Sequence, residues 1–177
     1  MFLKMRSAYF VATLSAVLSV AAVASAKYKA QNAKVLVHAK GPAGMKIEGK
    51  SSNLVIDETD KTVTFKTFLN SIDTDNGQRN KHMQERFECD KHPDITLTVD
   101  KDKIDEKEKK NASVKGTLKF HGVSKQVDVT YTINGKHVRA AFGLDVKDHK
   151  IDEKKLCAFG VCAQSEVKVE VDFDLKD

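Results

Sequence analysis

The feature that most constrains the fold is the stretch VKGTLKFHGVSKQVDVTYTI at positions 114–133. Apolar and polar side chains alternate along both of its halves, and a short polar segment that contains Gly122 separates them. Successive side chains on a β-strand point to opposite faces, so each half predicts a strand with one apolar face. Glycine allows the positive φ angle that a tight turn needs. The stretch therefore predicts a β-hairpin whose apolar face the rest of the chain must cover.

The same alternation recurs along most of the chain. It first appears at residues 33–39 and returns last at residues 166–175, where apolar residues alternate with charged ones. After the hairpin, the pair Asn134-Gly135 predicts a type I′ turn into the next strand, because both residue types tolerate positive φ angles. In total, the pattern predicts about eight strands with short connections.

One segment breaks this pattern. Between residues 71 and 93 the two-residue period is absent, but Met83 and Phe87 are four residues apart. This spacing places both side chains on one face of a helix. We therefore expect a short helix over residues 80–87 that lies against one end of the sheet.

Strands with one apolar face each must hide those faces from water within a single domain. They can form two packed sheets or a barrel. The short connections favour a barrel, as do long strands such as residues 138–146, whose edges closure would cover. Eight strands is also about the number at which a barrel has room for one small ligand. The sequence thus predicts an all-β, eight-stranded antiparallel barrel with one short helix, and a two-sheet sandwich is the alternative.

The first 26 residues have the pattern of a secretory signal peptide. Lys4 and Arg6 precede an uncharged, mostly apolar run that ends in the small residues Ala24-Ser25-Ala26. An uncleaved membrane anchor is the alternative, because a run of about 20 such residues is long enough to span a bilayer. We expect cleavage after Ala26, which leaves one exported domain at residues 27–177.

The net charge of +5 comes from basic and acidic residues that interleave, as they do at residues 101–110. Nucleic-acid-binding proteins more often cluster lysine and arginine, with aromatic residues between them. We therefore interpret the charges as a solvated surface and expect no nucleic-acid partner.

Three cysteines are present, and two of them are close in the sequence. Cys157 and Cys162 are separated by a segment whose Gly160 lets the chain fold back. In the oxidising compartment that an exported protein enters, this arrangement predicts a disulfide bond between them. Cys89 is then left over. A buried inert thiol is one interpretation, and a reactive or intermolecular thiol is the other.

The sequence contains no motif for catalysis or for metal binding. The spacings typical of zinc sites, phosphate loops and serine hydrolases are absent, and most histidines lie in polar or turn segments. We therefore expect a protein that is not an enzyme and that uses no metal and no cofactor. The alternative, chemistry on a bound lipid, needs a buried titratable group, for which His38 and Tyr131 are the candidates.

The apolar interior of the predicted barrel is either a filled core or a hollow that binds an apolar molecule. Each methylene of a ligand that is buried there contributes about 0.8 kcal/mol, which association and ordering costs partly offset. Composition does not decide between the two. The residues that strand alternation and helical spacing place toward such a ligand are Phe65, Met83, Phe87, Leu97, Val99, Leu118, Phe120, Val129, Tyr131 and Phe142.

Two blocks of the sequence combine into a recognisable pattern. The first comprises Ser71-Ile72-Asp73-Thr74, Arg79, His82-Met83, Phe87 and His92-Pro93-Asp94-Ile95, and the second is residues 114–125. Together they resemble the YceI-like polyisoprenoid-binding family, whose turn Gly-x-Leu-x-x-His-Gly-Val-x-Lys is similar to the second block. The resemblance extends over nearly all of residues 27–177. The chain departs from the family pattern at residues 31–34 and 148–151 and in the CAFGVC loop, so we expect the mouth of the barrel to differ.

The resemblance implies a lipocalin-like barrel in the periplasm, without an enzymatic centre. It also implies a ligand, a polyisoprenoid or a similar apolar lipid such as an isoprenoid quinone, held in the lumen for transport or storage. The alternative is a periplasmic stress-protective or interaction module with a filled core and no ligand. The chain length of the lipid, a homodimer and transient contact with a membrane are left open.

Overall fold

The computed structural model describes residues 30–105, 107, 111–152, 156–158 and 160–175. The predicted signal peptide lies outside the described residues. One α-helix, α1 (Gly77–Arg86), is accompanied by the short 3-10 helices η1 (Pro42–Gly44), η2 (Leu69–Ser71), η3 (Lys101–Lys103) and η4 (Val146–His149). The strands are β1 (Ala30–Lys40), β2 (Lys46–Ser51), β3 (Val55–Glu58), β4 (Thr62–Phe68), β5 (Asp94–Asp100), β6 (Ala112–Phe120), β7 (Val123–Asn134), β8 (His137–Asp145), β9 (Cys157–Ala158), β10 (Val161–Cys162) and β11 (Glu166–Leu175).

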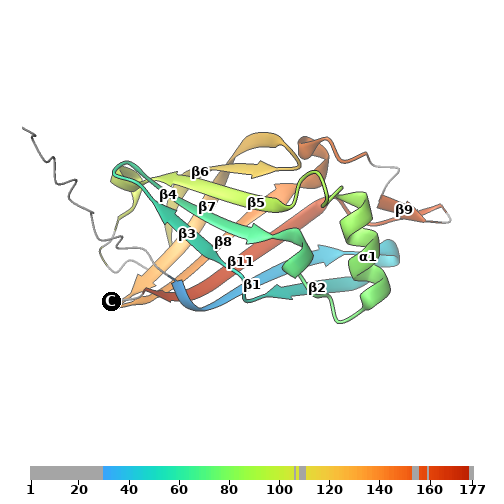
Figure 1. The fold of residues 1–177 in the computed structure, drawn as a ribbon, viewed down its shortest axis with the longest axis horizontal. Coiled ribbons are helices and arrows are strands. Elements are labelled where there is room, and N and C mark those ends of the chain that lie inside the picture. Colours follow the sequence, from blue (N-terminus) through green and yellow to red (C-terminus); the bar gives the residue numbers. More distant parts are fainter. Residues whose placement is uncertain (1–29, 106, 108–110, 153–155, 159, 176–177) are drawn as a thin grey trace, which may run out of the picture.

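Nine of these strands form one antiparallel sheet in the order β2-β1-β11-β8-β7-β6-β5-β4-β3, and the sheet curls around its apolar face (Figure 1). The all-β antiparallel architecture with one helix is therefore confirmed, and the sandwich is not formed. The predicted strand count of eight is wrong, because nine strands pair in this sheet. Within the described residues no ladder joins β2 to β3, so the sheet is a half-barrel.

The predicted hairpin is formed by β6 and β7. Phe120 pairs with Val123, so only His121 and Gly122 form the turn between them. Both have positive φ angles, 48° and 72°, as a type I′ turn requires. The next turn was predicted at Asn134 and Gly135, but it is formed by Gly135 and Lys136, because Asn134 pairs with His137. There only the glycine has a positive φ angle, of 61°, as in a type II′ turn.

The helix begins earlier than predicted and crosses one end of the curled sheet (Figure 1). It starts at Gly77 because the side chain of Asn76 accepts a hydrogen bond of 2.9 Å from the amide of Arg79. Such an N-cap satisfies a backbone donor that the first turn leaves unpaired. No helix in the described part of the chain has the length and apolar character that a bilayer span requires.

The open side of the half-barrel is held by a short contact that we call the seam, between residues 49–51 of β2 and residues 71–73. Lys50 and Asp73 exchange two backbone hydrogen bonds, of 2.7 and 2.8 Å, and the hydroxyl oxygens of Ser51 and Ser71 are 2.8 Å apart. Gly49 lets the chains approach, because a Cβ atom there would lie 2.6 Å from Cγ2 of Ile72. Part of the first family-like block therefore closes the open side.

The carboxylate of Asp73 in the seam makes the fold sensitive to acid. Its Oδ1 accepts hydrogen bonds from the Asn80 side chain at 2.8 Å and from the Asp75 amide at 3.0 Å. The bond from Asn80 is the main reason that the pKa of Asp73 is lowered from its ordinary value. Its contribution to stability is therefore complete above an unfolded-state pKa of about 3.9 and is lost as the pH falls through the folded-state pKa.

We expect the variant Asp73→Asn to show a shallower loss of unfolding free energy than the wild type below about pH 4. Urea unfolding at a series of pH values between 2 and 6 measures this difference. Asp60→Asn, an exposed position between β3 and β4, is the matched control and should retain the wild-type slope. Identical acid slopes for Asp73→Asn and the wild type would contradict the prediction.

Candidate functional site

The concave face of the curled sheet encloses an apolar cavity, which we call the lumen. Its cavity volume is about 100 Å³. Thr67 and Tyr131 are the lining residues with polar side-chain atoms. The hydroxyl of Thr67 donates to the Asn53 carbonyl at 2.7 Å, and that of Tyr131 accepts from the Asp105 amide at 2.7 Å. Both polar groups are thus satisfied by backbone, and the remaining lining is apolar.

The structure divides the ten residues that the sequence analysis selects into three groups. Leu118 is fully buried but lines neither the lumen nor the cavity described below. Met83, Phe87 and Phe120 line that second cavity, beneath the helix. The residues that line the lumen are Phe65, Leu97, Val99, Val129, Tyr131 and Phe142.

Several lining residues were missed, although the sequence carries a signal for them. Val35 and Val37 on β1, and Val169, Val171 and Phe173 on β11, follow the same two-residue alternation as the selected ones. Because β1 and β11 are neighbours in the sheet, these residues form a continuous part of the lumen wall. Ile72 and Ile104 lie outside the strands and carry no such periodic signal.

A second cavity lies between α1 and the end of the sheet, and we call it the α1 cavity. Its cavity volume is about 450 Å³. The residues that line both this cavity and the lumen are Val37, Ile72, Ile95 and Val169. Its lining differs from that of the lumen, because it includes polar and basic side chains as well as apolar ones. The polar and basic lining residues are Lys40, Thr74, Asn76, Gln78, Arg79, His82, Arg86 and Gln164.

Hydrogen bonds to Thr74 hold the helix over this cavity. Arg79 donates from Nε to the Thr74 hydroxyl at 3.0 Å and from Nη2 to the Thr74 carbonyl at 2.7 Å. Asn80 Oδ1 accepts from the amide and the hydroxyl of Thr74 at 2.9 and 2.6 Å. Thr74 is only 5% exposed, so these bonds satisfy buried polar groups. Packing of Phe87 edge-on against Phe120, with ring centroids 5.4 Å apart, fixes the other end of the helix.

The sequence matches the YceI-like domain over residues 16–175, which is most of its length. This chain belongs to the YceI-like family. Two solved structures have the same fold: a polyisoprenoid-binding domain from Saccharophagus degradans implicated in plant cell wall breakdown (16% identity, TM-score 0.67, 84% of this chain and 97% of that one) and BcnA from Burkholderia cenocepacia (14% identity, TM-score 0.62, 81% and 96%). No curated protein sequence matches the chain. The resemblance drawn from the sequence is thereby confirmed.

The two candidate catalytic groups of this YceI-like domain are both tied to neighbours. His38 lies between Val37 and Ala39 on β1 and points to the outer face, where Glu48 and Glu170 flank its ring at 3.7 and 3.9 Å. Tyr131 does line the lumen, but its hydroxyl is bonded to the backbone of Asp105. Neither arrangement pairs a titratable group with a second one inside the lumen.

Cys89 is buried in the apolar cluster beneath α1, together with Leu69, Ile72 and Phe120. Burial is the main cause that raises the pKa of its thiol, and the nearby Asp90 carboxylate adds to the effect. The thiolate is the reactive form of cysteine, so both burial and the raised pKa reduce its reactivity.

We expect Cys89 to react with a thiol-specific disulfide reagent at least about tenfold more slowly in the folded YceI-like domain than in urea. The release of the coloured thiol at pH 8 measures both rates on one sample. Equal rates in the two conditions would show that the thiol is accessible and would favour the reactive interpretation.

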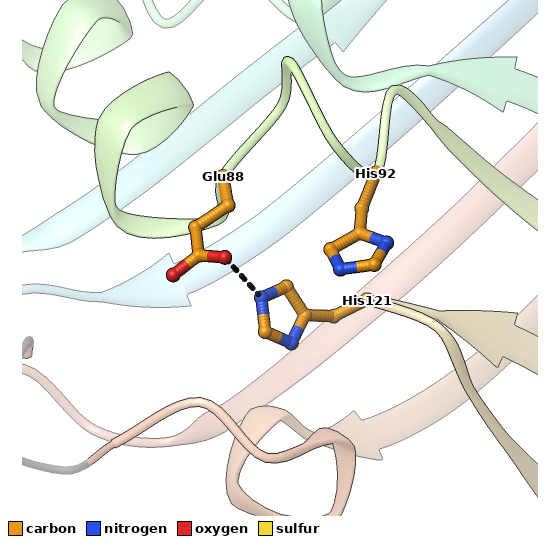
Figure 2. A group of neighbouring side chains, drawn as sticks. All are labelled: Glu88, His92 and His121. Carbon is orange, nitrogen blue, oxygen red and sulfur yellow. Dashed lines mark ion pairs between the residues drawn. The ribbon is translucent and has the colours of Figure 1, made fainter.

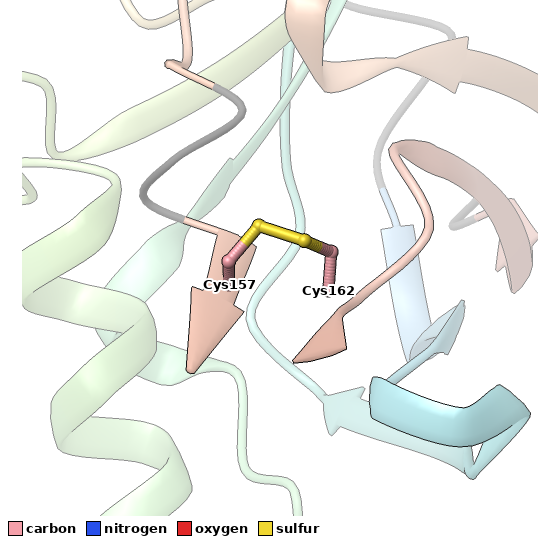
Figure 3. The surroundings of a disulfide bond; sticks show 2 residues. All are labelled: Cys157 and Cys162. Atoms are coloured by element: carbon pink, nitrogen blue, oxygen red, sulfur yellow. A yellow bond between two sulfur atoms is a disulfide. The ribbon is translucent and has the colours of Figure 1, made fainter. Parts of the chain in front are cut away.

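The CAFGVC loop forms a small ribbon at the α1 end of the sheet. β9 pairs with β10, Cys157 faces Cys162 across the pair, and their sulfur atoms are bonded (Figure 3). The flanking residues Leu156 and Ala163 are joined by a backbone hydrogen bond of 2.9 Å, and both line the α1 cavity. The loop in which this chain departs from the family pattern therefore forms part of that cavity's wall.

We expect the double variant with Cys157→Ala and Cys162→Ala to lose at most about 2 kcal/mol of unfolding free energy, because so short a loop restricts the unfolded chain little. Urea unfolding of the variant and the wild type measures the difference. The wild type with a reducing agent is the control and should match the variant. A loss well above this limit would mean that the bond also stabilises native contacts of the ribbon.

Proposed function

We propose that this YceI-like protein is an exported, non-catalytic binding protein that holds a polyisoprenoid or a similar apolar lipid, such as an isoprenoid quinone, for transport or storage. The observation that carries this proposal is the lining of the lumen, where the two residues with polar side-chain atoms both bond to backbone. A ligand there finds apolar contacts on every side. Each buried methylene contributes about 0.8 kcal/mol, so a chain of isoprene units gains affinity with length.

The arrangement of the two cavities suggests how such a lipid would lie. The hydrocarbon tail occupies the lumen, whose far end is bounded by Ile104 and the contact between Tyr131 and Asp105. The polar end lies in the α1 cavity, where the lining residues His82 and Arg86 offer polar contacts. Four residues line both cavities, so one elongated ligand can contact both.

Entry of a long chain requires the lumen to widen beyond its cavity volume of about 100 Å³. The half-barrel provides a route, because β2 and β3 are sheet edges and, among the residues that the structure describes, one isolated bridge in the seam holds the open side. Parting that bridge disrupts few hydrogen bonds compared with opening a continuous ladder. The lipid-free state is then narrow, and the loaded state is wider.

Export is supported by the sequence of the first 26 residues and by the cysteines. A disulfide bond between Cys157 and Cys162 is stable in an oxidising compartment such as the periplasm and is rare in the cytosol. We place the mature protein in the periplasm, at residues 27–177.

The test is native mass spectrometry and lipid extraction of protein purified from its own host, followed by uptake of added polyprenols. We expect a co-purifying lipid with a long hydrocarbon chain, or saturable uptake at one lipid per chain. Repeated recovery without lipid and without uptake would overturn the proposal. That result would favour a stress-protective or interaction module with a filled core, which the small accessible volume of the lumen also allows.

A further inference from the structure

A cluster of three half-buried potential metal ligands lies near the end of α1, outside both cavities. Figure 2 shows Glu88 and His92, from the segment that follows the helix, facing His121 from the turn between β6 and β7. One ligand atom from each residue lies within 4.8 Å of the other two. None of the three lines the lumen or the α1 cavity, so the lipid proposal does not account for them.

The local backbone brings these side chains together. The amide of His92 donates to the carbonyl of Glu88 at 2.9 Å, which closes a single turn and places the two side chains on one side of it. His121 is fixed by the type I′ turn, and the next residue, Gly122, leaves space for the His92 ring. A Cβ atom at Gly122 would lie 3.1 Å from Cε1 of His92. The two imidazole rings therefore approach with their centroids 4.5 Å apart.

The hydrogen bonds of His121 determine which of its ring nitrogens carries the proton. Nδ1 lies 3.0 Å from the carbonyl oxygen of His149, and because a carbonyl only accepts, Nδ1 is the donor. In the neutral ring, Nε2 is then an acceptor with a free lone pair. This side chain is only 10% exposed, and Nε2 is buried without a hydrogen-bond partner among the described residues.

The carboxylate of Glu88 faces this lone pair. Its Oε2 is 3.8 Å from Nε2 of His121, which is longer than a hydrogen bond. Two acceptors that face each other at this distance are stabilised by a positive charge placed between them. Lys91 Nζ, 3.2 Å from the same oxygen, now supplies a positive charge from the solvent side, and its side chain is 73% exposed and free to move away.

We propose that Glu88, His92 and His121 bind a zinc ion, with water at the fourth position. Two imidazoles and one carboxylate, with an open position, are a known zinc ligand set. Zinc bonds of 2.0–2.2 Å place tetrahedral ligand atoms about 3.3–3.5 Å apart, so separations of up to 4.8 Å must shorten by as much as about 1.5 Å. Rotation of the Glu88 side chain, which is 30% exposed, provides for this contraction.

The surroundings of His121 are those of a metal ligand. Ligating histidines usually donate their second N–H group to a backbone carbonyl or a carboxylate, as Nδ1 does here to His149. His149 is itself 1% exposed, and its own Nδ1 lies 3.2 Å from the carbonyls of Phe120 and Val123. The bound ion would join the segment after α1 to the β6–β7 turn and so fasten the helix over the α1 cavity.

The experiment uses the whole chain after treatment with a chelator, titrated with zinc chloride in a calorimeter. We expect one zinc ion per chain and a rise in melting temperature with zinc. His92→Gln and Glu88→Gln should each weaken binding at least about tenfold, since even the loss of a supporting hydrogen bond costs 10–100-fold. Both positions are partly exposed, so these variants should fold, which circular dichroism checks.

The control is His137→Gln, because His137 also contacts carboxylates, those of Asp174 at 2.8 Å and Asp172 at 3.4 Å, but lies outside the cluster. It should bind zinc as the wild type does. In nitrogen-detected NMR of the histidine rings, zinc should shift Nε2 of His121 and leave its Nδ1 protonated. Absence of saturable binding, or wild-type affinity in His92→Gln, would overturn the site whether or not the protein binds lipid.

Discussion

Replacing Ala140 by phenylalanine is expected to reduce lipid binding at least about tenfold while leaving the fold intact. Ala140 lies on β8 between Tyr131 and Val171 of the neighbouring strands, and all three line the lumen. A phenyl ring at this position occupies space that the lipid tail would use. Displacing two methylenes, at about 0.8 kcal/mol each, already corresponds to more than a tenfold change in affinity.

The adjacent residue provides a matched control. Ala141 points to the outer face of the sheet, opposite Thr130 and Glu170, so Ala141→Phe adds the same ring outside the lumen. Polyprenol uptake and the amount of co-purified lipid are measured for both variants. Lipid binding by Ala140→Phe that equals the wild type would place the lipid outside the lumen. A loss in both variants would point to the sheet as a whole and not to the cavity.

Replacing Leu118 by alanine is expected to lower the free energy of unfolding by about 2–5 kcal/mol. Leu118 is 0% exposed and belongs to the main apolar cluster, yet it lines neither cavity. Its side chain is therefore packed on all sides, and truncation removes burial and also creates a new cavity. Both effects destabilise the folded state.

Leu97→Ala is the matched control for this prediction. Leu97 pairs with Leu118 across β5 and β6 and projects to the same face of the sheet, but it lines the lumen, where part of its surface already borders an empty space. Removing it enlarges an existing cavity and breaks fewer contacts, so the loss should be smaller by about 1 kcal/mol or more. Urea unfolding compares the two variants. Equal losses would mean that the lumen is filled where Leu97 lines it.

Much of the fold was predictable because strand alternation is a local signal. The β6–β7 hairpin, the alternating faces of β11 and the helix near Met83 and Phe87 all follow from side-chain periodicity. The predicted count of about eight strands is wrong, because nine strands pair in the sheet. Pairing partners are set by the tertiary fold, so local pattern does not report them.

The candidate site was predictable only in part, for the same reason. Alternation identifies residues on the concave face, but it does not tell whether a side chain meets other side chains or a hollow. The side chains of Phe142 and Leu118 follow the same inward pattern. Phe142 lines the lumen, whereas Leu118 is fully buried and does not line it. Met83, Phe87 and Phe120 face a separate cavity, because the helix turns across the end of the sheet.

The cluster of Glu88, His92 and His121 left no recognisable spacing in the sequence, since its members come from two segments. Metal motifs are recognised when the ligands lie on one helix or one loop. Here the third ligand, His121, lies in the turn between β6 and β7 and meets the other two only in the folded protein. The family-like turn that contains His121 was visible, but its meeting with the segment after α1 was not.

The sequence by itself determined an antiparallel β-domain with one helix, a curved apolar face and membership of the YceI-like family. The domain and its apolar face follow from side-chain periodicity and turn residues, which act over a few neighbouring positions. The family membership follows from the resemblance of the two sequence blocks and the match of the domain over residues 16–175. Only the tertiary structure decided that the sheet is a nine-stranded half-barrel, that two cavities adjoin inside it, and that two histidines and a glutamate meet beside the helix. Cavities and clusters depend on how distant segments pack, and no local pattern encodes the space that packing leaves.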